Sequence, residues 1–333
     1  MLRAGIVLGL LVSAPLFAQR VPRIVIVSGD EKSVTYREIV PARVAIDADA
    51  GLFHRKGCPA IRPDMQWLAP AAATLKGMKA HACPVAAAAE YASHTESRPP
   101  RDPNVISVLF LGNSLTYYNE IPGTTSAIAA REKRPLLVEA VTRSGVTLEQ
   151  LWNDTFALKR LWLERWDYVV LQGGAGSAGP LFHADVYNRY LTLFADEIRK
   201  SGATPLFYQV WSLKKPAEHE AASLAAAKRN RMRVVPAGSA WHELIRTGRF
   251  QRLDRDTVHP DAFGAYLVAC SVYSTIYDKP AHGTPHDFRH LAAKHEVSDD
   301  ALREQTINDE DARALQDAAW RAVRRMKATP PPL

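Results

Sequence analysis

The sequence predicts an α/β domain with a central parallel sheet, preceded by a small α+β module at the N-terminus. From Val105 onward, five short apolar runs alternate with segments of helical length, which is the pattern of a parallel sheet covered by helices. Before that point, short segments rich in β-branched residues are typical of a separate, smaller unit. The segment 97–104 contains three prolines and predicts a linker between the two parts.

The composition is that of a folded protein with a sizeable core. The chain has 333 residues, of which 47% are apolar and 23% charged, and this balance excludes disorder along the whole chain. No internal apolar run approaches the ~20 residues of a membrane span. The 42 basic and 35 acidic residues give a net charge of +7, which favours acidic surroundings. The basic residues are not interleaved with aromatic ones, so we expect no nucleic-acid partner.

Residues 1–18 predict a signal peptide. Arg3 precedes an apolar run that ends at Ala18, and the polar residues Gln19 and Arg20 follow at once. We expect cleavage after Ala18, with an uncleaved N-terminal anchor as the alternative. The body of the chain is therefore expected to be exported to the periplasm or the medium of a bacterium, with no stable membrane insertion after cleavage.

Residues 20–96 are predicted to form the small module. Arg23–Val27 and Ser33–Tyr36 have the composition of strands, and Leu68–Lys76 has that of a helix.

Two of the three cysteines fall in this module, and they allow two interpretations. With His54, the spacing of Cys58 and Cys83 resembles small bacterial modules with a metal-binding layout, but Ala86 occupies the position of the last cysteine, so a four-ligand zinc site would need His81 or another residue. In an exported protein a disulfide between Cys58 and Cys83 is the simpler interpretation. We therefore assign no metal and no cofactor. Cys270 lies in an apolar segment and is expected to be a buried free thiol.

The larger domain is expected to cover residues 105–280, followed by a helical extension over 281–328. The predicted strands are Val105–Leu111, Leu136–Val141, Tyr168–Gln172, Thr204–Val210 and Arg233–Val235. The predicted helices are Pro122–Arg131, Leu148–Glu164, Ala184–Lys200, Ala217–Asn230, Ala262–Tyr277 and Asp309–Met326. The last helix has an apolar stripe and should pack on the domain.

Candidate catalytic residues follow the first strand and precede the last helix of the domain. Ser114 comes directly after a strand that ends in glycine, where backbone N–H groups can stabilise an oxyanion. Asp256 and His259 are three residues apart, a spacing that lets the carboxylate contact the imidazole. Each signal alone has a plain alternative, because serine often caps helices and Asp and His are common on polar loops. Together they predict a nucleophile with its base.

At this point the sequence resembles the SGNH, or GDSL-type, hydrolases. Gly112-Asn113-Ser114-Leu115 matches the nucleophile block with asparagine in place of aspartate, and Asp256 and His259 match the final D-x-x-H block. Gly145 matches the glycine of the second block. The resemblance implies a flavodoxin-like, three-layer α/β/α sandwich and a Ser114–His259–Asp256 triad. It also implies an oxyanion hole that includes the N–H groups of Ser114 and Gly145.

The third block departs from the family pattern, because the segment after the third strand has no asparagine. The amide of Gln172 is the candidate for this donor, and Ser177 and the glycine-rich backbone are its rivals. We also assign Asn113 and Trp211 to substrate binding; for Trp211, a place in the core or at its rim is the alternative.

The resemblance implies an exported serine esterase that hydrolyses carboxylic esters through an acyl-enzyme. The expected substrate is an acetyl ester, with an O-acetyl polysaccharide as the first candidate and lipid or small aryl esters as open alternatives. A non-catalytic envelope or carbohydrate-binding protein on the same scaffold is the competing interpretation, because the asparagine of the third block is missing.

Overall fold

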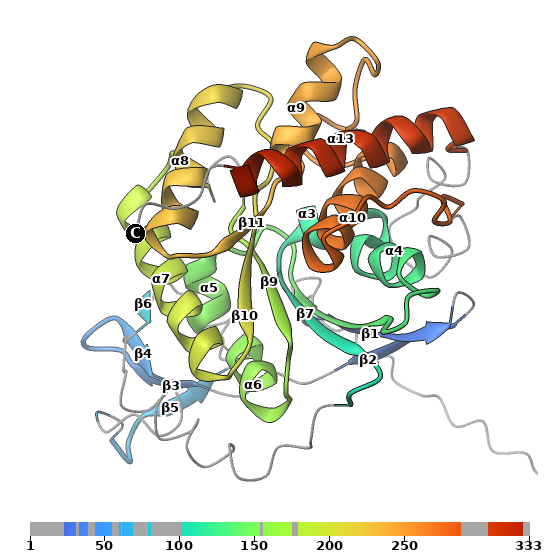
Figure 1. The fold of residues 1–333 in the computed structure, drawn as a ribbon. Helices are drawn as coiled ribbons and strands as arrows, with labels where there is room; N and C mark the ends of the chain where they lie inside the picture. Colours follow the sequence, from blue (N-terminus) through green and yellow to red (C-terminus); the bar gives the residue numbers. More distant parts are fainter. Residues whose placement is uncertain are drawn as a thin grey trace, which may run out of the picture.

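The computed structural model describes residues 23–30, 33–38, 44–54, 60, 62–68, 79–80, 102–153, 156–174, 179–287 and 306–328. The main sheet has seven strands in the order β11-β10-β9-β7-β8-β1-β2 (Figure 1). Their bounds are β1 Arg23–Asp30, β2 Ser33–Glu38, β7 Ile106–Gly112, β8 Leu136–Thr142, β9 Tyr168–Gln172, β10 Thr204–Tyr208 and β11 Arg233–Val235. The five strands from β7 to β11 are parallel, which confirms the predicted α/β class.

The order of the parallel strands is that of a flavodoxin-like sheet. Numbered along the chain from β7, the strands lie in the order 2-1-3-4-5. The order therefore reverses between β7 and β9, and this switch point is where open α/β sheets bind their ligands, beyond the carboxyl ends of the strands. The chemistry of the chain should be sought at the residues that follow these two strands.

Helices cover both faces of the sheet and complete the predicted sandwich (Figure 1). Their bounds are α3 Ser114–Tyr117, α4 Ile121–Ile128, α5 Leu148–Asn153, α6 Phe156–Leu163, α7 Ala184–Lys200, α8 Pro216–Arg229, α9 Ala237–Arg246, α10 Ala262–Tyr277 and α13 Asp309–Ala328, with a 3₁₀ turn η1 at Tyr118–Glu120. The segment predicted as one helix over 148–164 forms two helices, and α9 was not predicted.

The two apolar cores follow from the alternation of side chains along the strands. In β7, Val108 and Phe110 pack with α4, α10 and α13, whereas Leu109 and Leu111 pack on the opposite face with α5, α6 and α7. A strand buried on both faces needs this continuous apolar run, because successive side chains point to opposite sides. The same alternation makes β7 a rigid support for the residues that follow it.

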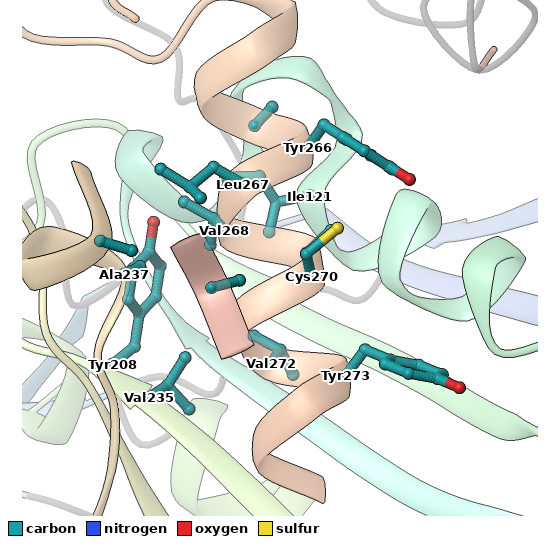
Figure 2. Packing of buried hydrophobic residues seen from close by; sticks show 14 of the residues in the cluster. Ile121, Tyr208, Val235, Ala237, Tyr266, Leu267, Val268, Cys270, Val272 and Tyr273 are labelled. Carbon is teal, nitrogen blue, oxygen red and sulfur yellow. The ribbon is translucent and has the colours of Figure 1, made fainter. Parts of the chain in front are cut away.

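Helix α10 lies at the centre of the first core. Figure 2 shows Leu267 and Val268 on the side that faces Tyr208 of β10, and Tyr266 and Cys270 on the opposite side of the helix. Cys270 is a buried free thiol, as predicted, and burial raises its pKa. Helix α13 covers α10 with its apolar stripe of buried Ala312, Leu315, Ala319 and Val323.

Two strands that the sequence assigned to the small module join the main sheet instead. β1 and β2 form an antiparallel hairpin, and β1 pairs antiparallel with β8. β8 would otherwise be the edge of the parallel sheet, and an unpaired edge exposes a row of backbone hydrogen-bonding groups. The composition predicted strands correctly, but composition does not specify a pairing partner.

The rest of the described module is a second sheet in the order β5-β3-β4-β6. Its strands are β3 Val44–Asp47, β4 Leu52–His54, β5 Gln66–Leu68 and β6 Lys79–Ala80. Asp47 closes the turn after β3 by accepting a hydrogen bond from Ala50 N–H at 3.1 Å. The predicted helix Leu68–Lys76 overlaps β5 at its first residue and otherwise lies outside the described residues, as do Cys58 and Cys83.

Candidate active site

Ser114 lies where strand β7 turns into helix α3. The strand ends at Gly112, and Asn113 caps the helix with its Oδ1, which accepts a hydrogen bond from Leu115 N–H at 3.1 Å. Ser114 is therefore the first residue of α3 and is 8% exposed. This placement puts its hydroxyl at the carboxyl edge of the sheet, beside the switch point between β7 and β9.

Ser114, His259 and Asp256 form a chain of hydrogen bonds. Ser114 Oγ lies 3.0 Å from His259 Nε2, and His259 Nδ1 lies 2.8 Å from Asp256 Oδ2. The structure thus brings together all three residues that the sequence predicted as nucleophile, base and orienting acid. This is the arrangement in which an imidazole can remove the proton of a serine hydroxyl while a carboxylate fixes its tautomer.

Asp256 is oriented by the turn that it begins. Its Oδ1 accepts hydrogen bonds from His259 N–H at 2.8 Å and from Val258 N–H at 3.1 Å. Burial alone would raise the pKa of Asp256, but the hydrogen bonds from His259 and Val258 outweigh burial and lower it. An ionised carboxylate accepts the Nδ1–H of His259, which leaves Nε2 free to accept the proton of Ser114.

The loop that carries Asp256 and His259 is closed by its own backbone. Arg255 N–H donates to the His259 carbonyl at 3.0 Å, and Asp261 N–H donates to the Leu253 carbonyl at 2.9 Å. At the tip, Thr257 has a φ of 68°, a left-handed conformation that β-branched residues seldom adopt. These contacts hold the base and its acid in one turn.

Gln172 ends strand β9 and contacts the segment that carries Ser114. Its Oε1 accepts hydrogen bonds from Asn113 N–H at 2.8 Å and from Thr116 Oγ1 at 3.0 Å. Because Asn113 N–H is an obligatory donor, the amide oxygen must point toward it, and the orientation of the Gln172 amide is fixed. Its Nε2 is buried and has no hydrogen-bond partner among the described residues, so one donor of the amide is left over.

Gly112 permits this approach of the two strand ends. A Cβ at residue 112 would lie 2.4 Å from Thr116 Oγ1 and 2.6 Å from Gln172 Oε1, closer than any side chain allows. The glycine before the Asn113–Ser114 turn is therefore required by packing against Gln172.

Gly145 lies in the loop after β8, with a φ of 65° that favours glycine. The loop is tied to the Ser114 segment on both sides of Gly145. Arg143 N–H donates to the Gly112 carbonyl at 3.4 Å, and Asn113 Nδ2 donates to the Val146 carbonyl at 3.1 Å. The structure thus places the glycine predicted for the oxyanion hole in a loop that contacts the residues before Ser114.

The two residues assigned to substrate binding have structural roles instead. Asn113 is 5% exposed, and both polar atoms of its side chain are bonded to the protein. Trp211 is 2% exposed and stacks on Trp241 at 3.9 Å between ring centroids, inside the first core. The substrate-binding prediction for Trp211 is wrong, because neither face of a buried indole is open to a ligand, and the alternative of a core position is correct.

One aromatic residue of the site was not predicted from the sequence. Tyr118 stacks on the imidazole of His259, with ring centroids 3.9 Å apart and planes 17° apart. The signal that could have found it is spacing, because residue 118 lies four positions after Ser114 and one helical turn places such residues on the same face.

Asp261, two residues after the base, is the capping residue of α10. Its Oδ1 accepts a hydrogen bond from Gly264 N–H at 2.9 Å, and the residue is 7% exposed. Burial raises its pKa from 3.8 to about 6, against the opposing hydrogen bonds from backbone N–H groups. The folded state therefore binds this proton more tightly than the unfolded chain does. The resulting stabilisation is complete below about pH 4 and is lost as the pH rises through about 6.

Asp261→Asn is expected to remove this pH dependence while keeping a capping oxygen. Between about pH 4 and about pH 7, the wild-type chain should lose about 2 kcal/mol more unfolding free energy than the variant, since each pKa unit corresponds to ~1.4 kcal/mol. Urea unfolding of both proteins at the two pH values measures the difference, and other titrating groups cancel in the comparison. Equal pH dependence in the two proteins would contradict the raised pKa.

The other features of the described residues are plain. They contain no group of three or more His, Cys, Asp or Glu side chains arranged to bind a metal. Within the same part of the chain, no helix combines the length and apolar character of a membrane span. Ser177, the rival of Gln172 for the third donor, lies outside the described residues.

With this geometry in hand, the chain can be compared with known proteins. No family model and no curated protein matches the sequence. Among solved structures, a DUF4886 family protein from Bacteroides uniformis matches with 18% identity and a TM-score of 0.50, over 66% of this chain and 95% of its own. A protein from Slackia heliotrinireducens, described as an SGNH hydrolase, matches with 23% identity and a TM-score of 0.45, over 52% and 100% of the two chains.

A mutant of an acetylxylan esterase from Geobacillus stearothermophilus also matches, with 14% identity and a TM-score of 0.42, over 56% of this chain and 98% of its own. The structural neighbours are SGNH and GDSL-like hydrolases. At such low identity the likeness concerns the fold alone. In the SGNH pattern the third block supplies an asparagine amide; here the end of the corresponding strand, β9, holds the amide of Gln172.

Proposed function

We propose that this chain is a carboxylic ester hydrolase that acts through an acyl-enzyme on Ser114. The observation that carries the proposal is the hydrogen-bonded chain of Ser114 Oγ, His259 and Asp256, with distances of 3.0 and 2.8 Å. The fold of its structural neighbours, which include esterases, adds support. The competing function, a non-catalytic binding protein, would not need a serine hydroxyl within hydrogen-bond distance of an oriented imidazole.

In the proposed reaction, His259 Nε2 accepts the proton of Ser114 as Oγ attacks the ester carbonyl. The oxyanion that forms accepts hydrogen bonds from the N–H groups of Ser114 and Gly145 and from Gln172 Nε2. His259 then gives the proton to the leaving alkoxide, and the acyl-enzyme remains. Water, deprotonated by the same imidazole, hydrolyses the acyl-enzyme and restores Ser114.

The substrate and the compartment belong to the same proposal. We propose acetyl esters of polysaccharides as the substrate, because the chain carries the features of an exported protein with a net positive charge. Because Trp211 is buried, it cannot stack on a sugar ring, which removes one argument for a carbohydrate substrate. The proposal that the alcohol component of the ester is a polysaccharide therefore depends on the predicted export. Protein recovered from the periplasm or medium of a producing bacterium should begin at Gln19 on N-terminal sequencing, whereas Met1 would contradict export by a cleaved signal.

The proposed nucleophile is tested by a fluorophosphonate, which bonds covalently to serines that a neighbouring base activates. The native chain should be labelled at Ser114, as identified in the digested protein by mass spectrometry, and heat-denatured chain should stay unlabelled. A native chain that does not react would support the non-catalytic alternative.

A further inference from the structure

We infer that Tyr118 is a positioning residue that fixes the plane of the His259 imidazole. The inference rests on the proposed function, because it assigns a residue to the base of that reaction. The ring centroids of Tyr118 and His259 are 3.9 Å apart and their planes differ by 17°, so the phenol ring covers one face of the imidazole. Tyr118 takes no proton and forms no bond in the proposed reaction; it acts through His259.

The hydrogen bonds of His259 leave one motion of the ring unrestrained. Both bonds lie in the ring plane, from Nδ1 to Asp256 Oδ2 and from Nε2 to Ser114 Oγ. They fix the axis through the two nitrogens, but the ring can tilt about that axis without breaking either bond. A stacked aromatic ring opposes this tilt, since tilting would drive the imidazole edge into the phenol face. The side chain of Asp256 is 45% exposed, so water competes with His259 for its carboxylate oxygens. The stacking of Tyr118 on the imidazole is therefore needed as a second restraint.

The backbone around Tyr118 is built to keep the phenol in this place. The Tyr118 N–H donates to the Ser114 carbonyl, so a single helical turn has the nucleophile at its start and Tyr118 at its end. The next two residues, Asn119 and Glu120, have φ values of 53° and 51°, a left-handed pair without a glycine. Such backbone strain persists only where the surroundings impose it, and it marks functional sites.

Asn119 ties the same segment to the loop of the base. Its Nδ2 donates to the Pro260 carbonyl at 2.7 Å, and Pro260 follows His259 directly. The segment Ser114–Asn119 therefore carries the nucleophile at its start. At its end, Tyr118 covers one face of the imidazole and Asn119 binds the residue that follows His259. Among charged groups, Asp256 faces the imidazole edge, and the Arg255 guanidinium lies 5.9 Å from the centre of the Tyr118 ring.

The test compares Tyr118→Leu, which removes the aromatic face, with Tyr118→Phe, which keeps the face and removes only the hydroxyl. For hydrolysis of an aryl acetate, we expect Tyr118→Leu to lower kcat by about 10- to 100-fold with little change in KM, because misplacement of a catalytic group by about 1 Å costs up to ~100-fold. Tyr118→Phe should restore most of the wild-type kcat. Wild-type kcat in the leucine variant, or an equal loss in both variants, would overturn the inference.

A second readout does not depend on activity. In NMR spectra, the ring protons of His259 should be shifted upfield by the stacked ring in the wild-type chain and in Tyr118→Phe, and should lose this shift in Tyr118→Leu. Wild-type protein that shows neither hydrolysis nor labelling would contradict the proposed function, while these signals would still decide the inference. Unshifted ring protons in wild-type protein would overturn it.

Discussion

Ser114→Ala is expected to abolish fluorophosphonate labelling and to lower kcat/KM for an aryl acetate by about 10⁴- to 10⁶-fold. Nothing else in the triad can replace the serine as nucleophile, and the activity that remains in such variants comes from the oxyanion donors and substrate binding alone. The fold should be kept, because the change removes one hydroxyl at the start of a four-residue helix. The measurement combines gel labelling with steady-state kinetics.

The matched control is Ser271→Ala, which also removes a hydroxyl from a buried serine. Ser271 lies inside α10, and its Oγ donates to the Leu267 carbonyl of the same helix at 2.8 Å. This variant should be labelled and should hydrolyse the ester like the wild-type chain. Labelling of Ser114→Ala at another serine would show that the nucleophile has been misassigned.

Gln172→Met is expected to lower kcat by about 10²- to 10³-fold with little change in KM, the usual effect of losing one oxyanion donor. Methionine keeps the length of the side chain but removes the Nε2 donor that the structure leaves without a partner. The variant should also lose roughly 1 to 3 kcal/mol of unfolding free energy, because Asn113 N–H loses its acceptor in a buried place. Kinetics and urea unfolding measure the two effects separately.

Thr116→Val is the control that distinguishes loss of the Gln172 Nε2 donor from disturbance of the hydrogen bonds around Gln172 Oε1. This variant removes only the hydroxyl that donates to Gln172 Oε1 and leaves Nε2 in place, so its loss of kcat should stay below about 10-fold. If Gln172→Met loses no more activity than Thr116→Val, the amide is not an oxyanion donor.

Much of this architecture could be predicted from the sequence because the main sheet is buried on both faces. Such strands are continuous apolar runs, and β9 and β11 have the predicted bounds. The triad could be predicted because Asp256 and His259 lie within one short turn and Ser114 directly follows a strand. Local spacing alone left each candidate with a plain alternative, and the combination of the two in one chain favoured the triad.

The parts that the sequence did not predict depend on contacts between distant segments. The buried apolar residues of helix α9, Ala237, Ala240, Trp241 and Leu244, recur at helical spacing, but its start depends on a distant segment, because a Cβ at Gly238 would lie 2.3 Å from the Val210 carbonyl. Trp211 was misassigned because its partner, Trp241, is thirty positions away and no local pattern joins them. The contact of Gln172 with the Ser114 segment likewise depends on a long-range hydrogen bond, from Asn113 N–H to Gln172 Oε1.

The bond between Ser114 and His259 spans 145 positions of the chain, from the end of the first parallel strand to the loop before α10. During synthesis the nucleophile therefore emerges long before its base, and no N-terminal fragment that ends before His259 contains both. Contacts of such long sequence separation form late, after the intervening segments have ordered. If the proposed function holds, Ser114 has no base while the chain is being synthesised, and hydrolysis can begin only after the segment with His259 has been made and folded.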